Sequence, residues 1–421
     1  MRYVVIGAGP AGVTAVETLR AQDPQGEVVL IGGEPEPAYS RMAIPYYLSD
    51  KIQEQGTYLR RDPDHLNNLG VRQIQQRVSA VHGSARTVQL VGGETVAFDR
   101  LLLATGSNPV KPPIDGLDQP GVHHCWTLED ARNIVKYARP GSRVVLMGAG
   151  FIGCIIMEAL AERGVDLTVV EMGDRMVPRM MDQASGNLIK QWCLDKGVTV
   201  HTSTRVTGVQ ANADGNARFT LACDPAGAIE ADLVVVATGV KPATDFLQGS
   251  GIELAQGVVV NEYLESSVPG IYAAGDVCEG MDWGSGERAV HAIQPVAAET
   301  GRIAALNMSG QVTPYPGSMA MNVLDTLGLI SVSYGQWMGV PGGDAVHRLD
   351  SDAYRYIKLQ FNGDRLVGAI TLGRTEHVGV LRGLIQSRTR LGKWKQHLME
   401  DPTRIMEAYL GATQLTANWI E

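Results

Sequence analysis

The chain has 421 residues, of which 44% are hydrophobic and 19% are charged, a balance typical of a globular protein with a full hydrophobic core. At roughly 100–200 residues per domain, this length predicts two or three domains. The formal net charge is −9 and no run of five basic residues occurs, which argues against nucleic acid as a partner.

The cysteines and the apolar segments indicate the compartment. The five cysteines are scattered along the chain, and none stands at a CxxC or metal-ligand spacing. We therefore expect reduced thiols, a cytoplasmic location and no metal site. No run of about 18 apolar residues occurs, so we expect no membrane span. A strand already begins at Tyr3, so we also expect no signal peptide.

The N-terminal segment predicts a strand, a glycine turn, a helix and a second strand. Residues 3–6 form a short apolar run of the kind found in buried parallel strands. The turn over 7–12 follows this run. Apolar residues then recur at helical spacing over 13–21, and a second apolar strand is predicted over 28–31.

The same order recurs near the middle of the chain. A strand is predicted over 144–147, a glycine turn over 148–153, a helix over 155–163 and a strand over 167–170. One architecture is therefore used twice. We predict two doubly wound, Rossmann-like α/β domains.

Each half also carries a later apolar strand that ends in Ala-Thr-Gly, and a third such strand ends in Ala-Ala-Gly-Asp. These strands and the residues that follow them are 101–103 with Ala104, Thr105 and Gly106, 234–236 with Ala237, Thr238 and Gly239, and 270–272 with Ala273, Ala274, Gly275 and Asp276. Ligands of doubly wound sheets bind at such strand ends.

Near residue 312 the pattern changes to that of a separate α+β domain. Residues 354–359 alternate like a half-exposed antiparallel strand, and 366–372 is its predicted partner across a hairpin at 363–364. Helical segments follow over 378–386 and 402–410.

The two glycine turns have the form GxGxxG between a strand and a helix, which is typical of dinucleotide binding. The first glycine permits the tight turn, the second lets the backbone approach a pyrophosphate, and the third lets the helix pack on the strand. The helix N-terminus then offers free N–H groups to the phosphates. The candidate binding residues are Gly7, Gly9, Pro10, Ala11 and Gly12 in the first turn, and Gly148, Gly150, Phe151, Ile152 and Gly153 in the second.

An acid follows the second strand of each half, where a carboxylate binds ribose hydroxyls. Glu34 comes 27 residues after Gly7, and Glu171 comes 23 residues after Gly148. A carboxylate there repels a 2′-phosphate, so Glu171 predicts NADH rather than NADPH. Two nearby arginines, Arg175 and Arg179, would weaken this preference if they faced the ligand, but a solvated loop is the simpler interpretation.

This order of motifs over the whole chain resembles the flavoproteins with two dinucleotide-binding domains. They include disulfide reductases, NADH oxidases and the NADH-dependent reductases of rubredoxin and ferredoxin, and the chain is most similar to the branch of rubredoxin reductase and the nitrite reductase flavin domain. The resemblance implies an FAD-binding domain over 1–109 and 240–312, an NAD-binding domain over 110–239, and a C-terminal interface domain over 313–421 that supports a homodimer.

The resemblance also implies roles for single residues. Asp276 would bind the ribityl chain of FAD, although an aspartate at this position also suits a helix cap. Arg41, in the segment Tyr39 to Tyr47, would lie beside the flavin and stabilise its reduced anion. Adenine contact is implied near Val78, and contact with the flavin ring near Gln294.

Two departures from the family pattern bear on the chemistry. Thiol-using relatives carry a cysteine in the segment that here holds Met42, and a thioether cannot act as that nucleophile. The first cysteine of the chain is Cys125. Many relatives also place a glutamate near the nicotinamide where this chain has Ile155. Because Met42 stands in place of the cysteine, thiol-dependent reductase, peroxidase or oxidase chemistry is disfavoured, and because Ile155 is aliphatic, nicotinamide placement must rest on packing and backbone groups.

We therefore predict an oxidoreductase that passes hydride from NADH to FAD and then electrons to an acceptor, first among them a small carrier such as rubredoxin or ferredoxin. Direct reduction of oxygen or a small oxidant is one alternative. A flavoprotein subunit or a redox-sensing interaction protein is another. No catalytic acid or base is assigned, and His291, His377 and Cys278 are interpreted as structural residues.

Overall fold

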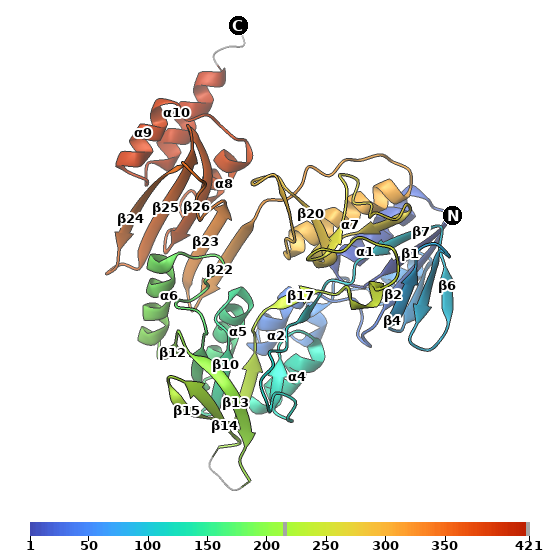
Figure 1. Cartoon of the computed structure of the whole chain (residues 1–421), viewed down its shortest axis with the longest axis horizontal. Helices are drawn as coiled ribbons and strands as arrows, with labels where there is room; N and C mark the ends of the chain where they lie inside the picture. The colour runs from blue at the N-terminus through green and yellow to red at the C-terminus, as the bar shows by residue number, and fades with distance from the viewer. Residues whose placement is uncertain (214–216, 418–421) are drawn as a thin grey trace. The chain divides into compact units, whose positions relative to one another are not determined.

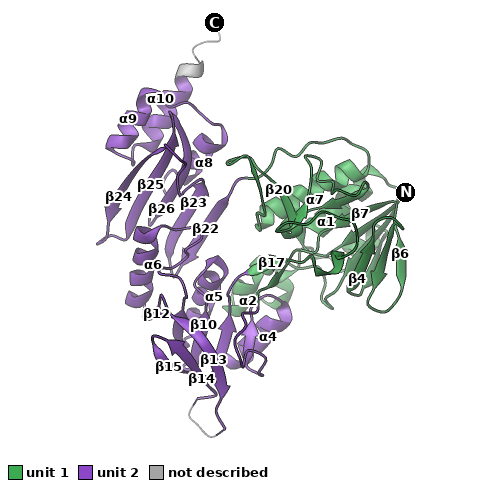
Figure 2. Ribbon diagram, in the orientation of Figure 1, with its two compact units in different colours: residues 1–110, 240–318 green, residues 111–239, 319–421 purple. Residues whose placement is uncertain are grey.

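The computed structural model describes residues 1–213 and 217–417, and the chain divides into two compact units (Figure 2). Unit 1 comprises Met1–Val110 and Val240–Ser318, and unit 2 comprises Lys111–Gly239 and Met319–Glu421. The chain therefore leaves unit 1 once and returns to it. The separate domain that the sequence analysis assigns to 313–421 stays a prediction.

Unit 1 is built on a five-stranded parallel sheet in the order β19-β7-β1-β2-β3, of which Figure 1 labels β7, β1 and β2. In the central strand, Val4 pairs with Val29 on one side and Leu101 on the other, and all three side chains are fully buried. Continuous apolar runs of this kind form strands that are covered on both faces. The strands are β1 (Arg2–Ile6), β2 (Glu27–Gly32), β3 (Val71–Gln75), β7 (Arg100–Leu103) and β19 (Ile271–Ala273).

Two long helices, α1 (Pro10–Gln22) and α7 (Gln294–Met308), lie side by side in unit 1 (Figure 1). They approach closely because Gly301 has no side chain: a Cβ there would lie 2.3 Å from the carbonyl oxygen of Ala11. Helix α1 begins earlier than residue 13, because proline suits the first turn of a helix. The shorter helices are α2 (Ile44–Leu48), α3 (His65–Asn68) and the 3-10 turns η1 (Arg41–Ala43), η2 (Glu54–Thr57), η3 (Asp245–Leu247) and η4 (Gly275–Val277).

Smaller sheets complete unit 1. A ribbon of β8 (Ser107–Pro109) and β17 (Val240–Pro242) carries the chain out of the unit and back into it. One three-stranded sheet consists of β4 (Val78–His82), β5 (Thr87–Leu90) and β6 (Thr95–Ala97), and another of β18 (Val258–Val259), β20 (Cys278–Asp282) and β21 (Glu287–Ala289).

Unit 2 contains a second five-stranded parallel sheet, in the order β12-β11-β10-β16-β9. Its plan repeats that of the first sheet: β10 stands where β1 stands, with β11 on one side and β16 on the other. The strands are β9 (Val122–His124), β10 (Arg143–Met147), β11 (Asp166–Val170), β12 (Thr199–His201) and β16 (Leu233–Val236).

Further elements of unit 2 surround this sheet. The helices are α4 (Leu128–Tyr137), α5 (Phe151–Glu162) and α6 (Gln183–Asp195), and the antiparallel strands are β13 (Arg205–Ala211), β14 (Phe219–Asp224) and β15 (Gly227–Ala231). The last part of the chain forms an antiparallel sheet in the order β22-β23-β26-β25-β24, accompanied by three helices. Its elements are β22 (Met321–Thr326), β23 (Leu329–Gly335), β24 (Asp344–Asp350), β25 (Arg355–Asn362), β26 (Arg365–Leu372), α8 (Val378–Gln386), α9 (Lys393–Glu400) and α10 (Ile405–Ala417).

The predicted fold class is confirmed: two doubly wound parallel sheets are followed by an α+β segment. Within residues 1–213 and 217–417, no helix combines the length and apolar character needed to cross a membrane.

Candidate functional site

The first glycine loop follows β1 and is shaped by close backbone contacts. Gly7 has a φ of +112°, and a Cβ on it would lie 2.0 Å from the carbonyl oxygen of Ala104. A Cβ on Gly12 would lie 1.9 Å from the carbonyl oxygen of Gly7. A Cβ on Gly9, in contrast, would meet no protein atom within 4 Å. The loop is therefore packed tightly against protein at two glycines and is open at the middle one.

The second glycine loop repeats this geometry after β10. Gly148 has a φ of +101° and packs against the carbonyl oxygen of Ala237, and a Cβ on Gly153 would lie 2.1 Å from the carbonyl oxygen of Gly148. The middle glycine, Gly150, again faces open space. The two loops thus share one design, in which the open glycine leaves room for a ligand against the backbone.

Both loops lie where the strand order of their sheet reverses. In unit 1 the chain builds outward from β1 to β3 and then adds β7 on the other side of β1, and in unit 2 β10 and β16 have the same relation. Ligands of doubly wound sheets bind at this point. No side chain caps the first turn of α1 or of α5, so the N–H groups of that turn are available to an anion.

Glu171 is fixed against the second loop. Its carboxylate accepts hydrogen bonds from the main-chain N–H groups of Ala149 and Gly173, each at 2.6 Å. Arg175 lies on the same loop, but its guanidinium donates to the carbonyl oxygens of Met181 and Pro178 at 2.9 and 3.2 Å. The Glu171 carboxylate is therefore held beside the second glycine loop, where the sequence predicts ribose binding. The Arg175 guanidinium is hydrogen-bonded within its own loop.

Glu34 is held differently from Glu171. The Arg41 guanidinium donates to Glu34 Oε1 at 2.5 Å and to the Tyr39 hydroxyl at 3.0 Å, and that hydroxyl donates in turn to Glu34. The structure therefore joins two residues that the sequence analysis assigned to different parts of a ligand. Tyr39 begins the segment that the resemblance places beside the flavin, but it was not predicted as a site residue.

Asp276 lies within η4, directly after β19, and not at the cap of a following helix. The Ser107 hydroxyl donates to its Oδ2 at 2.9 Å, and the N–H of Gly275 donates to Thr300 Oγ1 at 3.0 Å. Burial raises the pKa of the Asp276 carboxyl, while the Ser107 hydrogen bond and the charge of Arg41 oppose that rise. Asp276 is thus a largely enclosed carboxylate near a cation.

Three further predicted residues lie in unit 1. The Thr105 hydroxyl donates to the carbonyl oxygen of Ala243 at 3.0 Å, which ties the first Ala-Thr-Gly segment to the returning chain. Gln294 begins α7 and accepts a hydrogen bond from the Ser40 hydroxyl. Val78 begins β4 and packs on the main core of the unit. Their contacts with a ligand stay a prediction.

A family model described as "Pyridine nucleotide-disulphide oxidoreductase" matches residues 1–295. The chain belongs to this family. It is an oxidoreductase, and family membership implies a flavin and a pyridine nucleotide as cofactors.

Several proteins are similar to this family member over most of its length. It is 30% identical over 415 residues to the epsilon subunit of NADH-dependent phenylglyoxylate dehydrogenase from Aromatoleum evansii, which covers 98% of both chains. It is 31% identical over 319 residues to an NADH oxidase from Methanocaldococcus jannaschii, covering 74% of this chain and 70% of the relative. Ferredoxin reductase components are among its other relatives.

A solved structure shares the fold of this family member. The crystal structure of the covalent putidaredoxin reductase–putidaredoxin complex contains a chain that superposes with a TM-score of 0.89 at 23% identity, covering 98% of this chain and 99% of that one.

The residues present fit the cofactors that the family implies. Two open glycines at two switch points leave room for two pyrophosphate groups, and an acid follows the second strand of each half. The sequence analysis did not predict Ser107, which donates to Asp276, or Thr300, whose hydroxyl oxygen accepts from the N–H of Gly275. For Ser107 a signal existed, because it directly follows the first Ala-Thr-Gly segment.

The cysteines of this family member do not form a reactive thiol site. All five cysteines are buried, and burial raises the pKa of all five thiols. The pKa is raised to about 12 for Cys193 and Cys278. A thiolate is the reactive species, so these thiols are poor nucleophiles. Met42, which lies in the segment where the resemblance led us to expect the cysteine of thiol-using relatives, is 48% exposed.

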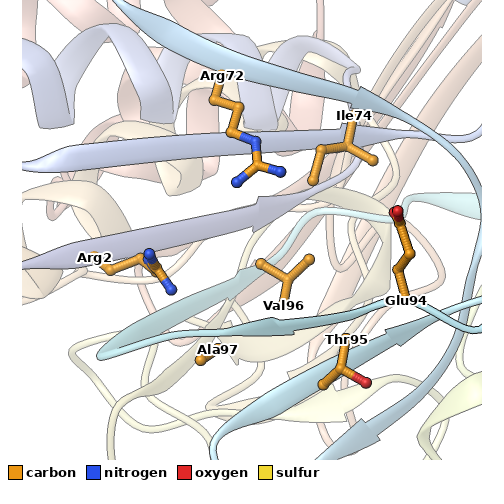
Figure 3. A pocket seen from close by; sticks show the side chains of 7 residues that line it. All are labelled: Arg2, Arg72, Ile74, Glu94, Thr95, Val96 and Ala97. Atoms are coloured by element: carbon orange, nitrogen blue, oxygen red, sulfur yellow. The ribbon is translucent and has the colours of Figure 1, made fainter.

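Unit 1 also contains a hollow of about 310 Å³, and Figure 3 shows the side chains that line it. Arg2 lines it at the start of β1, whereas the first glycine loop follows the end of that strand. The other lining residues come from β3 and from the segment around β6, and they are Arg72, Ile74, Glu94, Thr95, Val96 and Ala97. This hollow is therefore separate from the predicted ligand site of unit 1.

Proposed function

We propose that this chain is an FAD-dependent oxidoreductase that reacts with NADH and exchanges electrons with another redox protein. The observation that carries the proposal is the repeated glycine cradle, open at Gly9 and Gly150 and backed by an acid in each half. The burial of every cysteine argues against a thiol as the next redox centre.

We assign the first glycine loop to FAD and the second to NADH, because the resemblance to the family gives this order along the chain. The residues proposed to bind FAD are Gly7, Gly9, Pro10, Ala11, Gly12, Glu34, Arg41, Val78, Thr105, Gly106, Gly275, Asp276 and Gln294. The residues proposed to bind NADH are Gly148, Gly150, Phe151, Ile152, Gly153, Glu171 and Gly239. Bound FAD would supply the conversion between two-electron and one-electron transfer. The protein binds and orients both cofactors, and we assign no acid or base to hydride transfer.

NADH is favoured over NADPH by the loop after β11. Glu171 presents a carboxylate where the 2′-phosphate of NADPH would lie, and like charges at short range repel. The nearest predicted cation, Arg175, is engaged with carbonyl oxygens of its own loop.

A small carrier with an iron–sulfur centre, such as rubredoxin or ferredoxin, is the first proposed partner. Ferredoxin reductases among the relatives support this choice, as does a flavin site without a reactive thiol. The cytoplasmic location and the homodimer stay predictions.

A second candidate function is that of a flavoprotein subunit in a larger dehydrogenase. It is favoured by the match to the epsilon subunit of phenylglyoxylate dehydrogenase, which extends over 98% of both chains. In that arrangement the electron partner would be another subunit rather than a free carrier.

Anaerobic stopped-flow measurements test the proposal. The flavin-loaded protein is reduced with NADH or NADPH and then mixed with a ferredoxin, a rubredoxin or oxygenated buffer. Faster reoxidation by a carrier than by oxygen supports the carrier function. Rapid reoxidation by oxygen alone would indicate an NADH oxidase. Failure of both, with co-purification of iron–sulfur polypeptides from the native host, would favour the subunit.

A further inference from the structure

The hydrogen bond between Ser107 and Asp276 joins residues that are far apart in the chain. The Ser107 side chain is buried, with 5% exposure, and its hydroxyl donates to Asp276 Oδ2 at 2.9 Å. Ser107 is the first residue of β8, where it pairs with Pro242 of β17 in the ribbon that leaves and re-enters unit 1. Its position is therefore fixed by backbone pairing, independently of any ligand.

The second half of the chain offers an internal comparison, and the pair is missing there. The residue after the second Ala-Thr-Gly segment is Val240, which has no hydroxyl. Strand β9 occupies in its sheet the place of β19, so the position matching Asp276 is Thr127, three residues beyond His124. Thr127 caps α4. The serine–aspartate pair therefore belongs to the first cradle alone.

The chemistry of the two cofactors explains this difference. FAD carries an open polyol chain next to its pyrophosphate, whereas NADH carries a second ribose ring in the corresponding place. The hydroxyl groups of an open polyol can donate hydrogen bonds to an oxygen of a carboxylate that is held in place. A feature found only in the first cradle is thus suited to a group found only in FAD.

We propose that Ser107 is a positioning residue for FAD: by donating to Oδ2, it holds the Asp276 carboxylate so that Oδ1 accepts from the ribityl hydroxyls. This inference rests on the proposed function and adds to it a residue that acts through Asp276. Without the serine, the carboxylate would lose its side-chain donor and rotate more freely.

The charge of Asp276 gives a second consequence. Burial raises the pKa of Asp276, while the Ser107 hydrogen bond from β8, the charge of Arg41 from η1 and a hydrogen bond with the main-chain N–H of Asp276 itself favour the ionised form. Removal of the Ser107 hydroxyl therefore raises the pKa of Asp276. FAD binding that depends on the ionised carboxylate would then be lost at a higher pH on acidification.

The test measures FAD affinity of the full-length protein by fluorescence titration across the pH range. Ser107→Ala is compared with Ser107→Thr, which keeps the hydroxyl, and with Ser250→Ala, a buried serine of unit 1 whose hydroxyl donates to Leu247 instead. A fourth variant, Asp276→Asn, is combined with Ser107→Ala in a double-mutant cycle.

In Ser107→Ala, the FAD dissociation constant should rise about tenfold or more, as for loss of a hydrogen bond to a charged group. The loss of FAD binding on acidification should also occur at a higher pH than in the unaltered protein. Ser107→Thr and Ser250→Ala should bind as the unaltered protein does, and Ser107→Ala should add nothing to Asp276→Asn. Unchanged affinity and pH dependence in Ser107→Ala, or additive losses in the cycle, would overturn the inference. Absence of FAD binding by the unaltered protein would instead reject the proposed function.

Discussion

Glu171 accepts a hydrogen bond from the main-chain N–H of Ala149, with 2.6 Å between the nitrogen and Oε2. The carboxylate is thereby placed at the edge of the second glycine loop, after the strand that binds the adenosine ribose in doubly wound domains. The coenzyme preference of the enzyme should therefore depend on this one side chain and on the charge of its neighbours.

Replacement of this carboxylate should change the coenzyme preference. Met172 follows Glu171 and is 67% exposed, so an arginine there has room to reach a 2′-phosphate. In Glu171→Ala/Met172→Arg, the ratio of kcat/KM for NADH to that for NADPH should fall by about tenfold or more, as for a charged hydrogen bond. Steady-state kinetics with ferricyanide as acceptor measures both values.

Asp174 provides the matched control, since it is an exposed acid on the same loop that pairs with Arg175. Asp174→Ala should leave the preference unchanged. An equal shift in this variant would mean that the general charge of the loop, rather than the position of Glu171, selects the coenzyme.

The open middle glycines should separate the two cradles functionally. An alanine at Gly9 or Gly150 would meet no protein atom within 4 Å, and neither residue has a positive φ. The folded apoprotein should therefore tolerate both substitutions. Gly9→Ala should lower FAD content, and Gly150→Ala should keep FAD but raise the KM for NADH, because the added methyl group occupies ligand space.

Flavin absorbance per chain and NADH kinetics check this pair, and Gly379→Ala serves as control because its added methyl group is equally unobstructed in α8. Apoprotein melting temperatures should match for all three variants. Loss of FAD in Gly150→Ala with full FAD in Gly9→Ala would reverse the assignment of the cradles.

The buried thiols lead to a prediction about electron counting. With burial raising the pKa of Cys278 to about 12, no thiolate is available at neutral pH to form a redox couple with the flavin. Anaerobic titration with dithionite should therefore consume two electrons per flavin. N-ethylmaleimide at pH 7 should leave activity intact. Uptake of four electrons per flavin would show a second redox centre and contradict the thiol-free interpretation.

The sequence predicted those parts of the site whose signal is local. Each glycine loop lies between a strand and a helix within about thirty residues, so the order and spacing of the motif can be read directly from the sequence. The Ser107–Asp276 bond spans 169 positions and depends on how β8 and β19 are placed by other strands. No periodicity in the sequence reports such a contact.

Two segments that the sequence analysis did not predict, β24 and α9, have weak apolar patterns. Strand β24 is exposed along most of its length at the edge of its sheet, and α9 buries only Leu398. Residues that face solvent are free to be polar, so neither segment shows the alternation or helical spacing that prediction needs. By contrast, α8 occupies the predicted 378–386, because buried leucines recur on one face.

The N-terminus of α6 supplies a prediction about stability. Asp182 caps this helix by accepting from the N–H of Ser185 at 3.1 Å, and its other oxygen accepts from the Tyr356 hydroxyl at 2.7 Å and from Lys358 at 3.1 Å. Loss of the cap and of two charged hydrogen bonds should cost about 2–4 kcal/mol of unfolding free energy in Asp182→Ala.

The pH dependence of this contribution has a definite sign. Burial raises the pKa of Asp182, but the hydrogen bonds from Tyr356 and Ser185 and the Lys358 contact outweigh that effect, so the net shift is downward. A carboxyl whose folded pKa lies below its unfolded pKa stabilises the protein fully above the unfolded pKa of about 3.9 and loses this contribution as the pH falls through the folded pKa. Urea unfolding of unaltered protein and Asp182→Ala should therefore differ most at neutral pH and converge on strong acidification. A stability difference that persisted after protonation of Asp182 would assign the effect to packing. As a control, removal of the exposed ion pair Lys241–Asp245 should change the unfolding free energy little at any pH in the same assay.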